Sequence, residues 1–474
     1  MQMADSRIMI AGACSGSGKT MITCGLMRIF KEAGLRVAPF KCGPDYIDPM
    51  YHRVALGMEA QTLLKDGSVA GGGNLDTYFT DRNTTIDLLY EGGYGSSDIA
   101  IIEGVMGLYD GLGGTSLTGS SYELAHVTKT PIILVVDAKG MGRSILALIK
   151  GFLDYDEHKL ICGIILNRVS KTYYEKLKVH IEDELGITVT GYVPDDPKLH
   201  VGSRHLGLMT PTAAGCEGRI NTMDPGTHIA HVSKIIESSA GMIRDYVNIR
   251  VIRSIADKAE RLNKPEHSAS VPVLPFVEKR KIRKMAVAID EAFCFYYREN
   301  LRYLKAAGIE FIPFSPLHDT EIPENIDAIM LGGGYPEEYL KELSNNIPML
   351  DCIRSAAGCG IYIIAECGGF MYLQEAIEDR KGMAFKMAGV LPGICRWKGR
   401  LTRFGYVELS IDKLRLRGHE FHYYDSDSNG EDVCVTKAST GRKYKAMYAA
   451  DNILAGFAHL YYRSGRYNDN HEGR

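Results

Sequence analysis

The sequence predicts an α/β protein made of two domains, the first of them a doubly wound parallel sheet. Three observations carry this prediction. The chain has 474 residues, which is too long for one ordinary hydrophobic core. Short, continuously apolar runs alternate with segments of helical periodicity, as in doubly wound sheets. This alternation breaks at residues 264–284 and then resumes.

Five apolar runs in the first domain, residues 1–263, are expected to form its strands. They are continuously apolar rather than alternating, as in parallel strands that helices cover on both faces. The segment Lys19–Gly34 is expected to be the first helix, because its apolar residues recur on one face and Gly34 ends it. The strand runs are Ile8–Ala11, Val37–Lys41, Ile99–Glu103, Ile132–Asp137 and Cys162–Leu166.

Residues 264–284 are expected to be a linker, because they combine three prolines with a basic cluster. A second α/β domain is expected over residues 285–474, with more strands toward its C-terminal end. Its first strands are expected at Met285–Ile289, Phe311–Phe314, Ala328–Leu331 and Tyr362–Ala365.

Composition excludes several classes of protein. The net charge of -3 gives no reason to expect a nucleic acid or an acidic membrane surface as a partner. The 11 cysteines form no CxxC pair, so a zinc ribbon or disulfide scaffold is not expected. No run approaches the roughly 20 apolar residues that span a bilayer, and the N-terminus lacks a signal-peptide pattern. A reducing cytoplasmic location is the expectation.

The stretch AGACSGSGKT, residues 11–20, follows the first strand and resembles a phosphate-binding loop with shifted spacing. The usual early glycine position is Ala13, with Gly12 one step further out. Backbone N–H groups of Gly16, Ser17 and Gly18 are expected to face phosphate. Lys19 would add a charge for the outer phosphates and Thr20 a magnesium-binding hydroxyl. Taken alone, the stretch is also compatible with a plain glycine turn.

Acidic residues follow two further strands. Asp45 lies in KCGPDYIDP, and Glu103 opens EGVMGLYDG after an apolar run. Carboxylates at the carboxyl ends of parallel strands beside a phosphate loop are where Mg²⁺ is held. Thr20, Asp45 and Glu103 are therefore the expected metal ligands. Asp48 is expected either to orient a substrate or to cap a turn.

These motifs resemble known families. The G-x5-GKT loop is similar to that of dethiobiotin synthetase, and KCGPDYIDP with EGVMGLYDG looks like the cobyrinate a,c-diamide synthase family. The resemblance implies ATP and Mg²⁺, adenine recognition by Asn167, and substrate contacts by Tyr46, Asp48 and Arg204. Two departures are Cys42, where the family usually has a small apolar residue, and a glycine-containing insertion at Gln61–Gly73 that is expected to alter part of the substrate wall.

A second site is expected around Cys367. It follows an apolar strand, precedes a helix-like segment Phe370–Ala376, and is expected to be exposed on a sharp turn that favours the thiolate. Backbone N–H groups of Gly333, Gly334 and Gly368 are expected to form an oxyanion hole. His459 is the expected base, and His419 and His422 rank second as structural supports.

This arrangement resembles a class I glutamine amidotransferase, in which Cys367 would attack glutamine and His459 would move protons. Many such enzymes have an acid two residues after the histidine, where this chain has Tyr461. The cobyrinate-type branch also lacks that acid. What orients His459 is left open.

The resemblance implies ATP- and glutamine-dependent amidation of the a and c acetate carboxylates of cobyrinate through acyl phosphates. Nickel sirohydrochlorin or hydrogenobyrinate as the tetrapyrrole is the alternative, since the motifs do not touch the ring. Cobyric acid synthase lacks the GPDYIDP loop, and a non-catalytic P-loop regulatory protein is a further alternative. A homodimer is a general expectation for a two-domain enzyme of this size.

Overall fold

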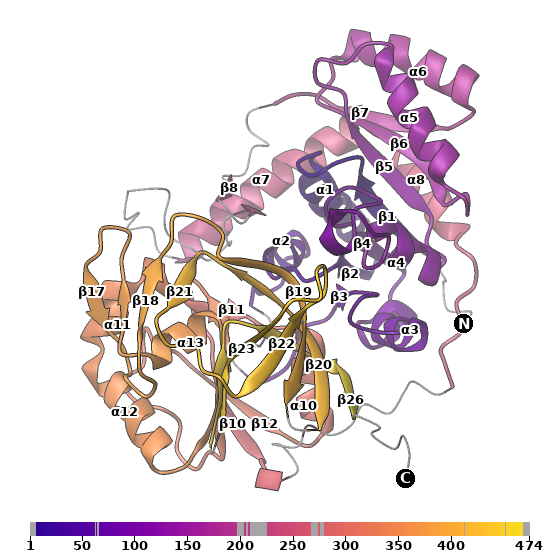
Figure 1. Ribbon diagram of the computed structural model, residues 1–474. Helices are drawn as coiled ribbons and strands as arrows, with labels where there is room; N and C mark the ends of the chain where they lie inside the picture. Colours follow the sequence, from indigo (N-terminus) through magenta and orange to yellow (C-terminus); the bar gives the residue numbers. More distant parts are fainter. Residues whose placement is uncertain are drawn as a thin grey trace, which may run out of the picture. The chain divides into compact units, whose positions relative to one another are not determined.

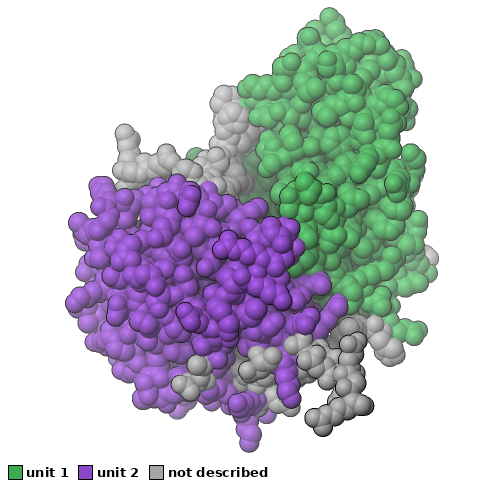
Figure 2. Space-filling view, viewed as in Figure 1, with its two compact units in different colours: residues 1–60, 71–269 green, residues 61–70, 270–474 purple. Residues whose placement is uncertain are grey.

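The computed structural model describes residues 6–61, 63, 66–196, 203–204, 207–208, 225–266, 274, 279–411, 413–450 and 452–467. The chain divides into two compact units, residues 1–60 with 71–269, and residues 61–70 with 270–474 (Figure 2). Much of the expected linker 264–284 lies outside the described residues. Within the described ranges no helix is long and apolar enough to cross a membrane.

Unit 1 is built on a seven-stranded sheet in the order β3-β2-β4-β1-β5-β6-β7, with every neighbouring pair parallel (Figure 1). This confirms the doubly wound sheet. The strands are buried on both faces, which is why their sequences are continuously apolar. They are β1 (Arg7–Gly12), β2 (Val37–Cys42), β3 (Gly73–Leu75), β4 (Ile99–Glu103), β5 (Ile132–Asp137), β6 (Ile161–Asn167) and β7 (Val189–Val193).

Helices cover this sheet, and a small β8–β9 pair follows it. Helix α7 packs against α1 so closely that a Cβ on Gly25 would lie 2.4 Å from Ile243 Cδ1. Ser239 on α7 also donates to the Met21 carbonyl of α1 at 2.9 Å. The elements are α1 (Lys19–Glu32), α2 (Ile47–Ala55), α3 (Arg82–Glu91), α4 (Ser121–Val127), α5 (Ser144–Tyr155), α6 (Lys171–Leu185), β8 (Ser203–Arg204), β9 (Gly207–Leu208), α7 (Pro225–Tyr246) and α8 (Ile249–Asp257).

Unit 2 has a six-stranded sheet in the order β12-β10-β13-β15-β25-β24, parallel except for β24 at one edge. The expected second α/β domain is thus confirmed. Its elements are β10 (Lys284–Ala288), α10 (Arg298–Ala306), β12 (Glu310–Phe314), β13 (Ala328–Leu331), α11 (Leu340–Asn345), α12 (Ile347–Gly358), β15 (Tyr362–Glu366), α13 (Gly368–Leu373), β24 (Tyr448–Ala450) and β25 (Ile453–Gly456).

The C-terminal part of unit 2 is rich in strands, as expected. The helix predicted at Phe370–Ala376 is wrong in its extent, because Gln374 is extended (ψ 178°) and Ala376 begins β16. The additional strands are β11 (Phe293–Phe295), β14 (Gly333–Gly334), β16 (Ala376–Glu378), β17 (Ala384–Lys386), β18 (Ile394–Trp397), β19 (Arg403–Ile411), β20 (Leu414–His422), β21 (Tyr424–Ser426), β22 (Val433–Lys437), β23 (Lys443–Ala446) and β26 (His459–Tyr467).

Residues 61–70, which begin six positions after the last residue of α2, belong to unit 2. Leu63 is fully buried in a hydrophobic cluster of that unit. Arg302 Nη2 donates to the Ala70 carbonyl at 2.7 Å, and Lys305 Nζ donates to the Gly67 carbonyl at 3.3 Å. Much of the Gln61–Gly73 insertion therefore packs as part of unit 2, and its effect on a substrate wall remains a prediction.

Candidate active sites

The phosphate loop joins β1 to α1, and its conformation explains the unusual glycine spacing. A side chain at Gly12 would place its Cβ 2.2 Å from Ser17 Oγ, so the loop closes tightly on this position. Gly16 and Gly18 have φ angles of 75° and 90°, in the left-handed region that favours glycine. Ala13 lies outside that region. The loop therefore needs glycine at position 12 and tolerates alanine at 13.

Lys19 and Thr20 form the start of α1, directly after the loop. Lys19 is buried, and burial together with the nearby charge of Lys41 lowers its pKa. A helix N-terminus favours anions through its free N–H groups and its dipole. A bound phosphate would offset the repulsion between the two lysines, so this end of α1 is suited to phosphate.

Asn167, expected to recognise adenine, lies at the end of β6 and against the phosphate loop. Its Nδ2 donates to the Ser17 carbonyl at 2.8 Å. A Cβ on Gly18 would lie 2.2 Å from the same nitrogen. The next residue, Arg168, pairs with Asp137 at the end of β5. The Asn167 side chain thus braces the phosphate loop, and its contact with adenine remains a prediction.

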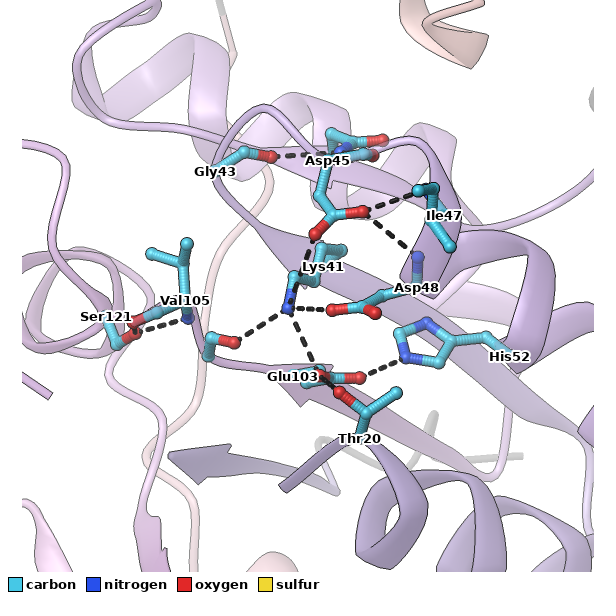
Figure 3. A network of polar contacts seen from close by, with 12 residues as sticks. Thr20, Lys41, Gly43, Asp45, Ile47, Asp48, His52, Glu103, Val105 and Ser121 are labelled. Atoms are coloured by element: carbon cyan, nitrogen blue, oxygen red, sulfur yellow. Dashed lines mark hydrogen bonds and ion pairs between the residues drawn. The ribbon is translucent and has the colours of Figure 1, made fainter. Parts of the chain in front are cut away.

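Side chains from β2, β4, α1 and α2 meet beside the phosphate loop (Figure 3). Lys41 Nζ, near the end of β2, lies 2.5 Å from Asp48 Oδ2 and 3.1 Å from Glu103 Oε1. Thr20 Oγ1 donates to Glu103 Oε1 at 2.6 Å. The other oxygen of Glu103 lies 2.6 Å from His52 Nε2. Lys41 and Glu103 are 2 % and 0 % exposed, so this pair is fully desolvated.

Charge compensation fixes the ionisation of this pair. Burial alone would lower the pKa of Lys41, but the carboxylates of Asp48 and Glu103 raise it above its ordinary value. Burial alone would raise the pKa of Glu103, but Lys41 and His52 bring it below its ordinary value. The cluster therefore holds an ammonium at Lys41 and a carboxylate at Glu103 at neutral pH.

Thr20, Asp45 and Glu103, the expected Mg²⁺ ligands, all border this cluster. Thr20 Oγ1 and Glu103 Oε1 lie 2.6 Å apart, close enough to share one ion at Mg–O distances of about 2.1 Å. Asp45 Oδ2 lies 4.0 Å from Lys41 Nζ, while Oδ1 accepts two backbone N–H groups at the start of α2. These oxygen donors fit Mg²⁺ by type. Within the described ranges, no three His, Cys, Asp or Glu side chains are spaced to hold a metal, so the Thr20 hydroxyl and substrate oxygens would complete the shell.

The residues expected to contact substrate have different positions. Tyr46 is the half-buried residue that precedes α2, and Asp48 lies in the first turn of α2, bound to Lys41. Arg204 lies in β8, and its side chain is outside the described part of the chain. Tyr46 and Asp48 are thus brought to the phosphate-loop site.

Cys367 lies on a sharp turn between β15 and α13, with φ 48° and ψ -103°. A non-glycine residue in this region is strained, as at nucleophile turns between strand and helix. The expectation of an exposed side chain is wrong, because Cys367 is 9 % exposed and belongs to a buried cluster. Neighbouring turns pack tightly around it: a Cβ on Gly368 would lie 2.8 Å from Pro336 Cδ, and one on Gly369 would lie 2.2 Å from the Leu331 carbonyl oxygen.

His459 begins β26 and is buried. Burial alone would lower the pKa of His459, but Cys367 and Glu366 raise it to about 9. The His419 ring stacks on that of His459, with centroids 4.9 Å apart, and burial and His459 bring the pKa of His419 well below its ordinary value. Burial lowers the pKa of His422 to about 4. His459 is therefore the protonated ring at neutral pH, and the other two are neutral.

The three glycines expected to form the oxyanion hole lie near the Cys367 turn. Gly333 and Gly334 form β14, which pairs with β11, and Gly368 is the first residue of α13. A Cβ on Gly368 would lie 3.2 Å from Gly334 N, and one on Gly333 would lie 2.4 Å from His459 Cε1. The Gly368 N–H has no acceptor within its own helix. The structure thus brings these glycines together with Cys367 and His459; their role toward an oxyanion remains a prediction.

Three residues at these sites were not singled out from the sequence. Lys41 could have been singled out, because it is a charged residue in a strand whose sequence predicts burial on both faces. His52 follows Asp48 by one helical turn, which places both on one face of α2. Glu366 ends β15 directly before Cys367 and lies 3.6 Å from His459. Sequence alone gives no reason to pair it with that histidine.

Two family models match the chain, one in each unit. Residues 8–208 match the CobQ/CobB/MinD/ParA nucleotide binding domain family. Residues 284–467 match the CobB/CobQ-like glutamine amidotransferase domain family. The first match agrees with the phosphate loop, and the second with the Cys367 turn.

Curated relatives match nearly the full length. A cobyrinate a,c-diamide synthase of Caldanaerobacter subterraneus subsp. tengcongensis is 37% identical over 463 residues, 95% of this chain and 94% of the relative. Proteins of the same name from Priestia megaterium and Listeria innocua are 33% and 36% identical, and cover 98% and 96% of this chain and 95% and 96% of their own length. The chain belongs to the cobyrinate a,c-diamide synthase family of glutamine amidotransferases.

Proposed function

We propose that this protein amidates the a and c acetate carboxylates of cobyrinate, using ATP and glutamine, to give cobyrinate a,c-diamide for cobalamin biosynthesis. The observation that carries the proposal is the presence of two chemically different candidate sites in one chain. One is a phosphate loop beside a desolvated Lys41–Glu103 cluster. The other is a strained Cys367 turn beside a protonated His459. The names of the full-length relatives supply the substrate.

The first site would make a carboxylate reactive toward ammonia. A carboxylate is a poor electrophile, because its oxygen is a poor leaving group. One of its oxygens attacks the γ-phosphorus of ATP, ADP leaves, and an acyl phosphate forms. Lys19, at the start of α1, and Lys41 are the proposed cations that stabilise phosphate charge. Thr20, Asp45 and Glu103 would hold Mg²⁺, which neutralises charge on the phosphate oxygens when it is bound.

The second site would produce the ammonia. The Cys367 sulfur attacks the amide carbon of glutamine, and His459 delivers a proton to the departing nitrogen, so that ammonia and a thioester form. Water then hydrolyses the thioester to glutamate and restores the cysteine. Ammonia attacks the acyl phosphate carbon, phosphate leaves, and the nitrogen loses a proton to give the amide. The backbone amides of Gly333, Gly334 and Gly368 are the proposed donors to the oxyanion.

The identity of the tetrapyrrole is tested by offering three candidate rings in parallel assays. Cobyrinate, nickel sirohydrochlorin and hydrogenobyrinate are offered separately with ATP, Mg²⁺ and glutamine, and mass spectrometry follows the conversion of each carboxylate to an amide. We expect two conversions on cobyrinate. If only one of the other rings is converted, that ring is the substrate, and the proposed amidation chemistry still holds. Binding without phosphate release or amide formation on any ring would refute the enzymatic function in favour of a regulatory or carrier role.

The division of labour is tested with Cys367→Ala. This variant should lose amidation driven by glutamine and keep amidation driven by an added ammonium salt, because the phosphate-loop site is untouched. Lys19→Ala should show the opposite loss, with phosphate release abolished and glutamine hydrolysis retained. Loss of both activities in Cys367→Ala, with a folded protein, would contradict two separable sites.

A further inference from the structure

The glutamine-hydrolysing site lacks an acid at the position where many such enzymes have one. Two residues after His459 stands Tyr461, which is fully buried. Its ring packs edge-on against that of Tyr297, with centroids 5.1 Å apart. A phenol supplies no negative charge at neutral pH. Something other than residue 461 must therefore orient a charged imidazole in this site.

Glu366 has the position that this role requires. It is the last residue of β15, is 4 % exposed, and directly precedes Cys367. Its Oε2 lies 3.6 Å from His459 Nδ1. Its Oε1 accepts a hydrogen bond from the backbone N–H of Leu460 at 3.4 Å. The carboxylate therefore contacts both the ring of the histidine and the backbone immediately after it.

Strand register makes this approach a fixed feature of the fold. Strands β15 and β25 are parallel neighbours, with Glu366 opposite Gly456. Cys367 N donates to the Gly456 carbonyl at 2.8 Å, and His459 begins β26 three residues after Gly456, the last residue of β25. Successive residues of a strand point to opposite sides, but the turn at Cys367 breaks that alternation. One strand end can thus direct both a carboxylate and a thiol toward the same imidazole.

Among the described residues, the two histidines near His459 offer no anion to Nδ1. From β20, the stacked ring of His419 is neutral at neutral pH and is bound at Nδ1 by Tyr297 OH at 2.8 Å. His422, at the end of the same strand, is also neutral. The thiol of Cys367 is the group that reacts with glutamine in the proposed function, so it is not the partner sought for Nδ1. A distance of 3.6 Å is within ion-pair range and longer than a hydrogen bond, and such bonds commonly shorten when substrate binds.

We propose that Glu366 is the positioning residue of the glutamine-hydrolysing site: its carboxylate holds the Nδ1–H of His459 and so takes the place of the acid that Tyr461 cannot supply. Glu366 does not touch the reacting atoms and acts through the imidazole. It fixes the ring orientation and the tautomer, and it stabilises the imidazolium that protonates the departing nitrogen. This inference rests on the proposed function, because it assigns a role within glutamine hydrolysis.

The test uses the full chain with Glu366→Gln, which keeps an oxygen for the Leu460 N–H and removes the charge. The kcat/KM for glutamine hydrolysis should fall on the order of 100-fold. The alkaline limb of its pH profile follows loss of the His459 proton. Removing a neighbouring anion makes the imidazolium easier to deprotonate, so this limb should move to lower pH by about one unit. Amidation driven by ammonium salt should be unchanged.

Two further variants separate charge from packing. Glu366→Asp keeps the charge, so its alkaline limb should stay near that of the wild type while its rate is intermediate. Glu375→Gln removes an exposed carboxylate of the same unit and should match the wild type. Equal losses in Glu366→Gln and Glu366→Asp with an unmoved limb would overturn the proposal and leave a packing role. So would a wild-type rate and profile in Glu366→Gln.

A spectroscopic measurement on the wild type decides the matter even if Glu366→Gln does not fold. With Cys367 alkylated by a diazoketone analogue of glutamine, an Nδ1 proton held by a carboxylate gives a proton resonance far downfield of ordinary amides. This resonance should be present and should vanish in His459→Ala. Its absence from the wild type would overturn the proposal. If the wild type itself hydrolyses no glutamine, the proposed function fails instead, so the two failures are distinct.

Discussion

Replacing Lys41 with methionine should destabilise unit 1 strongly, because Lys41 is the cation at the centre of a desolvated acidic cluster. Its ammonium lies 2.5 Å from Asp48 and 3.1 Å from Glu103, and donates to the Gly104 carbonyl at 2.9 Å. Methionine has a similar length and no charge. Glu103, with no exposed surface, then loses its compensating cation, and its ionised form becomes costly.

The size of the effect follows from the burial of the pair. Removing one partner of a buried ion pair costs about 3–5 kcal/mol, because the remaining charge stays out of water. His52 and Thr20 still bind the Glu103 oxygens, which places the expectation toward the lower end of that range. We therefore expect a loss of about 3 kcal/mol in the free energy of unfolding of unit 1 near neutral pH.

The loss of stability in Lys41→Met should be larger at neutral pH than at acidic pH. In the wild type the pKa of Glu103 is below the ordinary value of 4.5, so its contribution to stability is present above that value and is lost as pH falls through the folded-state pKa. In the variant the charge of Lys41 is gone, and we expect burial, the largest influence on this group, to bring the pKa of Glu103 above its ordinary value. Its ionisation then opposes folding increasingly as pH rises above 4.5. The difference in free energy of unfolding between the variant and the wild type should thus become smaller on acidification. We expect it to shrink by about 1–2 kcal/mol between neutral pH and about pH 5.5.

Native-state hydrogen exchange at the amides of β2 and β4, corrected for the intrinsic rate at each pH, reports on unit 1 separately from unit 2. Lys150→Met is the matched control. Its ammonium pairs with Asp154 at 2.9 Å, but both side chains are more than half exposed, and such pairs contribute about 0–1 kcal/mol. A deficit for Lys41→Met no larger than that of the control, or one that is constant with pH, would refute the reasoning.

Three further predictions use close contacts in the structure. Leu63→Ala should lower the stability of unit 2, not unit 1, by about 2–5 kcal/mol in hydrogen exchange, because Leu63 is fully buried in the core of unit 2. Gly333→Ala should remove glutamine hydrolysis and keep ammonium-dependent amidation, because the new Cβ would lie 2.4 Å from His459 Cε1. Gly12→Ala should weaken ATP binding in calorimetry and keep glutamine hydrolysis, because the Cβ would lie 2.2 Å from Ser17 Oγ and force the phosphate loop to move.

Each of these predictions has a matched control on the surface. Leu148→Ala, at a side chain that is 37% exposed, should change stability by no more than about 0.5 kcal/mol. Gly358→Ala and Gly140→Ser place a Cβ where no heavy atom lies within 4 Å, although Gly140 has a φ of 72° and adds backbone strain. Gly358→Ala is therefore the control for Gly333→Ala and Gly12→Ala. Destabilisation of unit 1 by Leu63→Ala, or retained activity in either glycine variant, would contradict the packing described.

The sequence predicted five of the seven strands in the sheet of unit 1 and four of the six in the sheet of unit 2, because a strand buried on both faces leaves a continuous apolar run. Ile99–Glu103, Ile132–Asp137 and Ala328–Leu331 have the predicted bounds. The C-terminal end of helix α13 was harder to predict. The helix ends where the backbone of Gln374 is extended, and no proline or glycine marks that point in the sequence. The low exposure of Cys367 could not be derived either, since it depends on a buried cluster formed by residues that are far apart in the sequence.

Two of the residues that sequence reasoning missed, Lys41 and Glu366, owe their contacts to the lateral register of parallel strands. Lys41 of β2 lies directly opposite Glu103 of β4, and Glu366 of β15 lies opposite Gly456 of β25, just before His459. Parallel neighbours are joined by long crossovers, so residues that face each other are far apart in sequence. Their register is set by the apolar runs, since a slip of one residue would turn each strand's side chains to the wrong face.

The cost of desolvation explains why the charged partners are found at strand ends. A carboxylate or ammonium in the middle of such a strand would be buried between two helical layers with no partner, at a cost of several kcal/mol. At the carboxyl end, a loop or helix N-terminus supplies the compensating groups, as Thr20 of α1 does for Glu103. The reactive groups of both units therefore gather at the carboxyl ends of their parallel sheets. That is where a charge can be desolvated enough to have a shifted pKa and still be paired.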